Sequence, residues 1–173
     1  MQTANIFTMQ LILGYIAWAL CFRKYAWPRL RAMDRVEAHR AIATLHSFRF
    51  VGLVFIVPGV VGSQLPNSFA VFAAYADLAT AVLALLALLT VRVKSVFWFF
   101  VVAFNVVGAA DFLLDYYHAV RANLPMVAGQ LGAAYVIPTL VVPMLMITHI
   151  AAFHMLRRPS VTSEDSAGVV PTH

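Results

Sequence analysis

The chain has 173 residues, of which 62% are hydrophobic and only 11% are charged, and its mean hydropathy is +0.85. A soluble domain of this composition would lack the polar side chains to cover its surface, so we predict an integral membrane domain. The net charge of +5 does not indicate nucleic-acid binding, because the basic residues lie mainly at the ends of apolar runs. The single cysteine, Cys21, excludes an internal disulfide.

Five apolar runs are each long enough to cross a hydrocarbon core of about 30 Å as a helix. They are residues 6–22, 41–61, 68–90, 96–117 and 126–156. We therefore predict an all-α membrane domain, residues 1–158, with five transmembrane helices. A disordered cytoplasmic tail, residues 159–173, is expected to follow it, because this segment is rich in Ser, Thr and Gly. Between the first two spans, residues 28–40 form either an amphipathic interfacial helix or a solvated basic loop.

The basic residues predict the orientation of these spans. Ten of the twelve fall in the first loop, the third loop and the tail, and these lie on one side of the membrane if there are five spans. Arg121 lies on the opposite side, and Arg49 lies within the second span. By the positive-inside rule we predict a multi-pass protein of the cell membrane, with its N-terminus outside and its C-terminus in the cytoplasm.

Three carboxylates occur inside the apolar runs, where an unpartnered charge is costly and therefore indicates function. Asp77 lies near the middle of the third span, and Asn105 and Asp111 share one face of the fourth. We predict that Asp77, Asn105 and Asp111 form a site that binds a ligand or a proton. Farther along the fourth span, we interpret Asp115 and His118 as residues that cap its outer end in the headgroup region.

A second group of polar residues is expected near the cytoplasmic end of the bundle. His46 and Arg49 lie on one face of the second span, and His149 reaches the same depth on the fifth. The two histidines could ligate a haem or a metal ion, or relay protons. Because Arg49 stays charged, its side chain must either extend to the cytoplasmic surface or find an anion inside the bundle.

These residues leave three functions open. The first is a carrier of a small solute, linked to protons and using Asp77, Asn105 and Asp111, with the proline-containing fifth span as the moving part. The second is a membrane enzyme that uses an aspartate as acid or base on a lipophilic substrate. The third is a redox subunit that holds haem or metal at His46 and His149. Five spans are few for a lone carrier, so we expect a homo-oligomer or partner membrane subunits.

Overall fold

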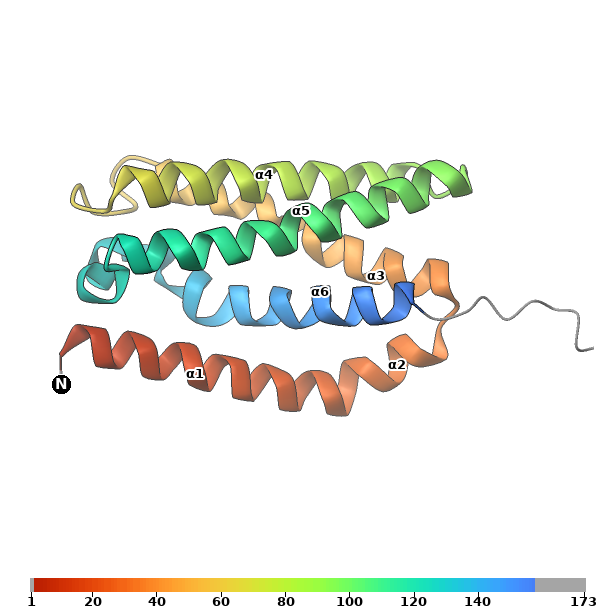
Figure 1. Cartoon of the computed structure of the whole chain (residues 1–173), viewed down its shortest axis with the longest axis horizontal. Helices are drawn as coiled ribbons and strands as arrows, with labels where there is room; N and C mark the ends of the chain where they lie inside the picture. The colour runs from red at the N-terminus through yellow and green to blue at the C-terminus, as the bar shows by residue number, and fades with distance from the viewer. Residues whose placement is uncertain (1, 158–173) are drawn as a thin grey trace, which may run out of the picture.

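A computed structural model describes residues 2–157, which fold into an elongated helical bundle without strands (Figure 1). The predicted tail, residues 159–173, lies outside the described residues. Four helical stretches within residues 2–157 are long and apolar enough to cross a membrane. They are Thr3–Ala32, Asn67–Leu89, Lys94–Arg121 and Ile137–Leu156. The all-α prediction is therefore confirmed, and the chain has helices suited to a membrane.

The first stretch is longer than the predicted span of residues 6–22. Helix α1 (Thr3–Cys21) continues through a π-helical segment (Phe22–Ala26) into α2 (Trp27–Ala32), whose first turn contains Pro28. Pro28 has no N–H to donate to this continuous stretch, and it directly follows the irregular π-helical segment. Residues 28–40 are thus mostly helical and do not form a loop, and they belong to two helices. They complete the first stretch and then begin α3 (Arg35–Ser47), which Asp34 caps through the N–H groups of Val36 and Glu37.

The predicted second span, residues 41–61, is not one continuous α-helix. Helix α3 ends at Ser47, and a 3-10 helix, η2 (Phe48–Ile56), follows it directly. Residues beyond it turn instead of extending the span, because Pro58 has no N–H to donate and Gly59 adopts a φ of 83°. Together α3 and η2 run back along the bundle beside α4 (Figure 1).

The predicted spans 68–90 and 96–117 correspond to α4 (Asn67–Leu89) and α5 (Lys94–Arg121), which form an antiparallel pair. The buried face of α4 carries alanines at a helical spacing: Ala70, Ala73, Ala74, Ala81, Ala84 and Ala87. Small side chains let neighbouring helices approach closely, which is how membrane helices gain packing energy. This face therefore brings α3, η2 and α5 close to the two polar residues it also carries, Asp77 and Thr80.

The predicted fifth span, residues 126–156, is too long at its N-terminal end. Residues 124–135 form a 3-10 segment, η3 (Leu124–Tyr135), in which Gly132 breaks the helix with a φ of 52° and a ψ of −129°. The membrane-length stretch begins only at the π-helical η4 (Ile137–Val141) and continues as α6 (Val142–Leu156). A proline in each of these two segments removes a backbone donor, so a regular helix cannot continue through the junction.

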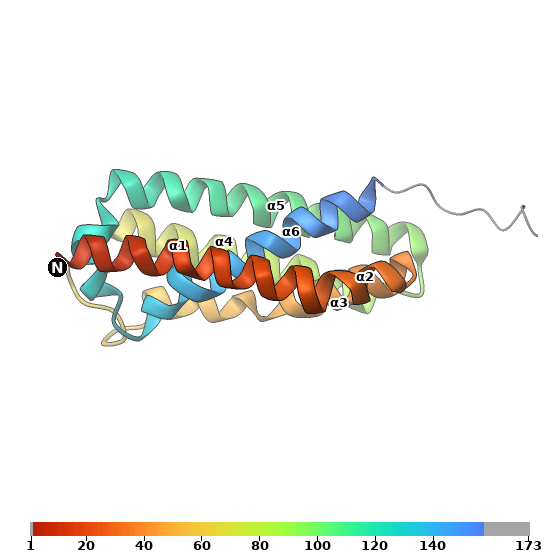
Figure 2. The same ribbon diagram turned by 90° about the horizontal axis from the view of Figure 1, so that it is seen from below.

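The described chain begins and ends at opposite ends of the bundle (Figure 1). Seen from below, α1 and α2 together run along the length of the bundle, and α6 crosses it obliquely (Figure 2). The core consists of two apolar clusters, one near each end. On α4, Asp77 and Thr80 lie between the residues that join the first cluster and those that join the second. The bundle thus contains a buried polar layer between two apolar ones.

Candidate functional site

Arg49 is the centre of the polar layer and is only 4% exposed. Its Nε donates to Asp77 Oδ1 at 2.6 Å, and its Nη2 pairs with Asp111 Oδ2. Its Nη1 lies 3.3 Å from both the carbonyl oxygen of Gly108 and His149 Nε2. One guanidinium on η2 therefore joins α4, α5 and α6 through a single network.

The surroundings of this guanidinium are shaped to hold it. Its Cζ lies 3.9 Å from the ring centroid of Phe112, a cation–π contact. Two glycines make room for the ion pairs. A Cβ atom at Gly52 would collide with the Asp77 carboxylate, and one at Gly108 would lie 2.7 Å from Arg49 Nη1. The close approach of Arg49 to both carboxylates therefore requires glycine at positions 52 and 108.

His149 is oriented from two sides. Its Nδ1 lies 2.9 Å from Asn105 Oδ1, while Asn105 Nδ2 donates to the carbonyl oxygen of Val101 at 2.8 Å. The amide oxygen can only accept, so Nδ1 carries the proton of the imidazole. Nε2 is then the acceptor that faces Arg49 Nη1. This arrangement is that of a neutral histidine held in one tautomer, and it extends the network from Arg49 to Asn105.

His46 lies beside it and is fully buried. Its Nε2 is 3.0 Å from Thr148 Oγ1, which itself donates to the Leu145 carbonyl oxygen at 2.8 Å. The His46 and His149 ring centroids are 4.0 Å apart. The expected convergence of His46, Arg49 and His149 is therefore confirmed.

The same contact gives the haem hypothesis no support, because a bis-imidazole haem needs a porphyrin between its two ligands. Within residues 2–157, no three His, Cys, Asp or Glu side chains stand close enough together to hold a metal ion. A proton relay, which needs only hydrogen-bond spacing, stays a prediction.

Asp77 was expected to share a site with Asn105 and Asp111; it is buried in the bundle, and its hydrogen-bond partner is Arg49. The opposed carboxylate on α5 is Asp111, so the expected approach of Asp77 to the Asn105–Asp111 face takes place through the guanidinium. Arg49 was expected either to extend to the cytoplasmic surface or to find an anion inside the bundle. The second expectation is confirmed, because its side chain is 1% exposed and pairs with two carboxylates. The two predicted groups of polar residues thus form one site.

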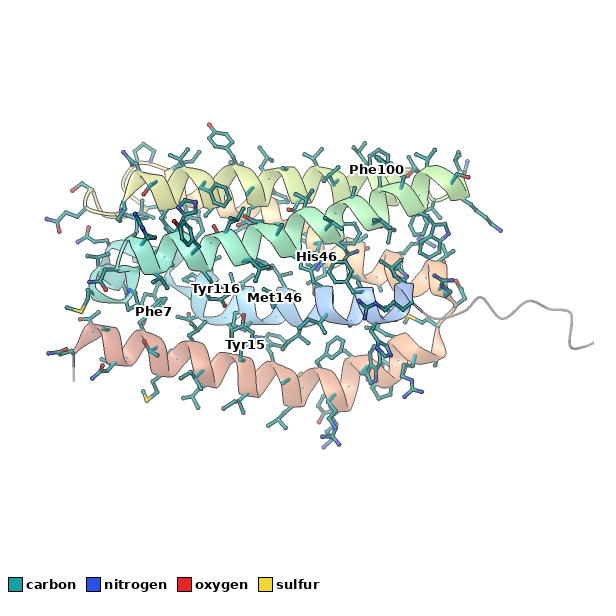
Figure 3. All side chains as sticks on the ribbon, in the orientation of Figure 1. Phe7, Tyr15, His46, Phe100, Tyr116 and Met146 are labelled. Carbon is teal, nitrogen blue, oxygen red and sulfur yellow. The ribbon has the colours of Figure 1, made fainter. Side chains whose placement is uncertain are left out.

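An apolar cavity of about 140 Å³ adjoins this centre toward the N-terminal end of the chain. Asp77 and Asp115 line it, together with Tyr116, whose hydroxyl is 2.5 Å from that of Tyr15 on α1. Figure 3 shows the two tyrosines between α1 and α5, with Phe7 near the end of α1 and His46 farther toward the other end. The remaining wall is almost wholly apolar and includes Phe7, Leu11, Phe55, Phe69, Phe112, Leu124, Ile137, Pro138 and Val142.

The structure places Asp115 in this cavity wall, which differs from the expected cap of the outer helix end. Its Oδ1 is buried and has no hydrogen-bond partner within residues 2–157. His118 lies apart from the site and packs against the rings of Phe72 and Tyr117. Sequence reasoning missed Asp115 as a site residue, although its i+4 spacing from Asp111 places both on one face of α5.

The fold and site define a helical bundle with four apolar helices suited to a membrane and a buried ionic centre. A family model, the domain of unknown function DUF8737, matches residues 6–157, and the chain belongs to this family. Neither a curated protein nor a solved structure matches the chain.

Proposed function

We propose that this protein is a five-pass carrier of the cell membrane, which moves a small solute and couples its movement to a proton bound at Asp77, Asp111 and Asp115. The observation that carries the proposal is the charge balance of the centre. Arg49 is the only buried Lys or Arg within residues 2–157. Two carboxyl groups bind it directly, and the third lies one helical turn beyond Asp111.

One fixed positive charge cannot neutralise three carboxylates. A buried carboxylate without a counter-ion is costly, so the centre must take up protons or other cations, two positive charges in all, to become neutral. His149 does not supply that charge, because its Nε2 acts as an acceptor toward Arg49. A centre that can exchange one positive charge for another is what proton-linked transport requires.

The five-pass topology is supported by where the basic segments lie. Arg35 at the start of α3 donates to the carbonyl oxygen of Leu156 at 3.2 Å and lies 5.2 Å from the Trp98 ring of α5. The first loop, the start of α5 and the end of α6 therefore meet at one end of the bundle. A cytoplasmic location for that end follows from the positive-inside rule and puts the N-terminus outside.

The moving part in this proposal is the segment from Gly132 to Pro143. It contains the backbone break at Gly132, the π-helical η4 and two prolines, and it borders the cavity through Ile137, Pro138 and Val142. Interrupted helices absorb backbone rotation more readily than regular ones, and π-helical segments often mark functional sites. Five passes are few for a lone carrier, so we expect the protein to act as a homo-oligomer or with partner membrane subunits.

The test uses the purified full chain in proteoliposomes that enclose a pH-sensitive dye. Alanine, glucose, succinate and phenyltrimethylammonium are added in turn, and the internal pH is followed. We expect at least one solute to change the internal pH in wild-type vesicles beyond the change in empty ones. Asp77→Asn should abolish the change while the protein still folds.

Asp34→Asn is the matched control, because it makes the same substitution at a helix cap outside the site and asparagine also caps helices well. This variant should transport like wild type. A pH change that persists in Asp77→Asn, or no change with any of the four solutes, would contradict the proposed function.

A further inference from the structure

We infer that the cavity beside Asp77 and Asp115 binds a small organic cation with an apolar body, such as a quaternary ammonium ion. The inference rests on the proposed function and names its substrate class. Five aromatic side chains line the cavity: Phe7, Phe55, Phe69, Phe112 and Tyr116. Two carboxylates and the hydroxyl groups of Thr8 and Tyr116 form the polar part of its wall, and no Lys, Arg or His side chain is among its lining residues.

The aromatic rings supply one half of this recognition. The face of an aromatic ring carries negative charge density, so rings around a cavity attract a cation while they also pack against its alkyl groups. The bundle already uses this contact, since Phe112 holds the Arg49 guanidinium at 3.9 Å. Phe112 also lines the cavity, so the cavity continues the environment in which a cation is already bound.

The carboxylates supply the other half. Asp77 is bound through Oδ1 to Arg49, but Asp115 Oδ1 is buried without a hydrogen-bond partner within residues 2–157. Asp111, which is 3% exposed, likewise has an Oδ1 without a partner there. The face of α5 that carries both aspartates thus has more acceptor oxygens than donors. A quaternary ammonium ion supplies positive charge without needing hydrogen bonds, which matches a wall with few polar groups.

Other ligand classes fit this wall less well. An anion would meet two carboxylates and no basic side chain. A divalent cation such as Mg²⁺ or Ca²⁺ needs about six oxygen ligands, whereas the carboxylates, Thr8 and Tyr116 are the only side chains of the cavity wall that offer oxygen. A sugar needs many hydrogen bonds, which an aromatic and aliphatic wall does not provide.

Binding of such a cation would exchange charge with a bound proton. With Asp115 protonated, the incoming cation pairs with the carboxylate and the proton leaves to solvent. No covalent bond other than O–H breaks, and the net charge of the cavity is unchanged. The cation and the proton are therefore alternative occupants of one site. Transport of the cation in one direction would then be coupled to transport of a proton in the other.

The experiment measures binding of radiolabelled phenyltrimethylammonium to the detergent-purified full chain, together with proton release in weakly buffered solution. Wild type should bind the probe saturably and release about one proton per cation bound. Asp115→Asn should weaken binding at least tenfold and abolish the proton release. Asp34→Asn, the matched control, should behave like wild type.

Phe69→Leu is the second variant, because it keeps an apolar side chain in the wall and removes one ring face; it should weaken binding several-fold without altering proton release at saturation. The inference is overturned if wild type does not bind the probe, or if Asp115→Asn binds it equally well. A pH change in proteoliposomes with alanine or glucose, but not with phenyltrimethylammonium, would overturn the substrate class and leave the carrier standing.

Discussion

Replacing Arg49 by leucine tests the ionic centre directly. The substitution removes the guanidinium from two buried carboxylates while it leaves an apolar side chain in a buried position. Breaking a buried ion pair by removing one partner costs about 3–5 kcal/mol, because the remaining charge has no counter-ion. We expect Arg49→Leu to lose stability of this order, which corresponds to a fall in Tm of about 6–20 °C for a chain of this length.

The thermal midpoint of the purified protein in detergent, followed by circular dichroism at 222 nm, is the measurement. The matched control is Arg40→Leu, which removes an arginine from the exposed pair with Glu37, whose atoms are 2.5 Å apart. Both of its side chains are more than two-fifths exposed, so this pair should contribute no more than about 1 kcal/mol. Arg40 lies in α3 and Arg49 in the following η2, and the two arginines differ in burial.

A triple variant separates the ion pairs from the packing of the arginine stem. Arg49→Leu, Asp77→Asn and Asp111→Asn combined leave no unpaired charge among these three residues. Because the penalty arises from the uncompensated carboxylates, the triple variant should be more stable than Arg49→Leu alone. The ionic centre does not stabilise the bundle if the triple variant is less stable than the single variant. The same conclusion follows if Arg49→Leu has the same Tm as wild type.

Three further predictions follow from other features. Reporter fusions at the two termini should report opposite sides of the membrane, with the C-terminus in the cytoplasm, and finding both on one side would refute five passes. Gly108→Ala should destabilise the bundle by about 1–3 kcal/mol, because its Cβ would lie 2.6 Å from His149 Nε2, whereas Gly129→Ala has open space and should be near neutral in the same thermal assay. Burial lowers the pKa of His39, which lies near the start of α3, so its unfolded form binds protons more readily than its folded form. Stability should therefore fall as pH drops below about 6.5, and His39→Asn should flatten that part of the pH–stability curve.

The long regular helices could be predicted from sequence because their signal is local. The apolar runs at 68–90 and 96–117 correspond to α4 and α5 within a few residues. The predicted bounds of the spans were wrong where glycine or proline interrupts an apolar run. Residues 126–136 are as apolar as a membrane helix, but Gly132 breaks them, and Pro58 with Gly59 turns the chain before the predicted end of the second span.

The candidate site, like the fold, could be predicted from the sequence only in part. Hydropathy alone marks Asp77 and Asp111 as unusual. The same argument requires Arg49 either to bind an anion or to extend its side chain to the membrane surface. Sequence could not show that Arg49 serves both carboxylates, since they stand 28 and 62 residues away from it. It also could not distinguish Asp115 in a cavity from Asp115 at a lipid headgroup, because that depends on which elements pack over the C-terminal half of α5.

The all-helical class, the apolar helices and the uneven distribution of basic residues follow from the amino-acid sequence, because each of these depends on residues that are neighbours in the chain. Which buried groups meet depends on the tertiary structure. A polar side chain on an apolar helix reports that a partner is needed, but the partner depends on how the helices rotate and slide against one another. Here Gly52 lets η2 approach Asp77 on α4, and Gly108 on α5 leaves room for the side chains of Arg49 and His149, so that one guanidinium joins three helices.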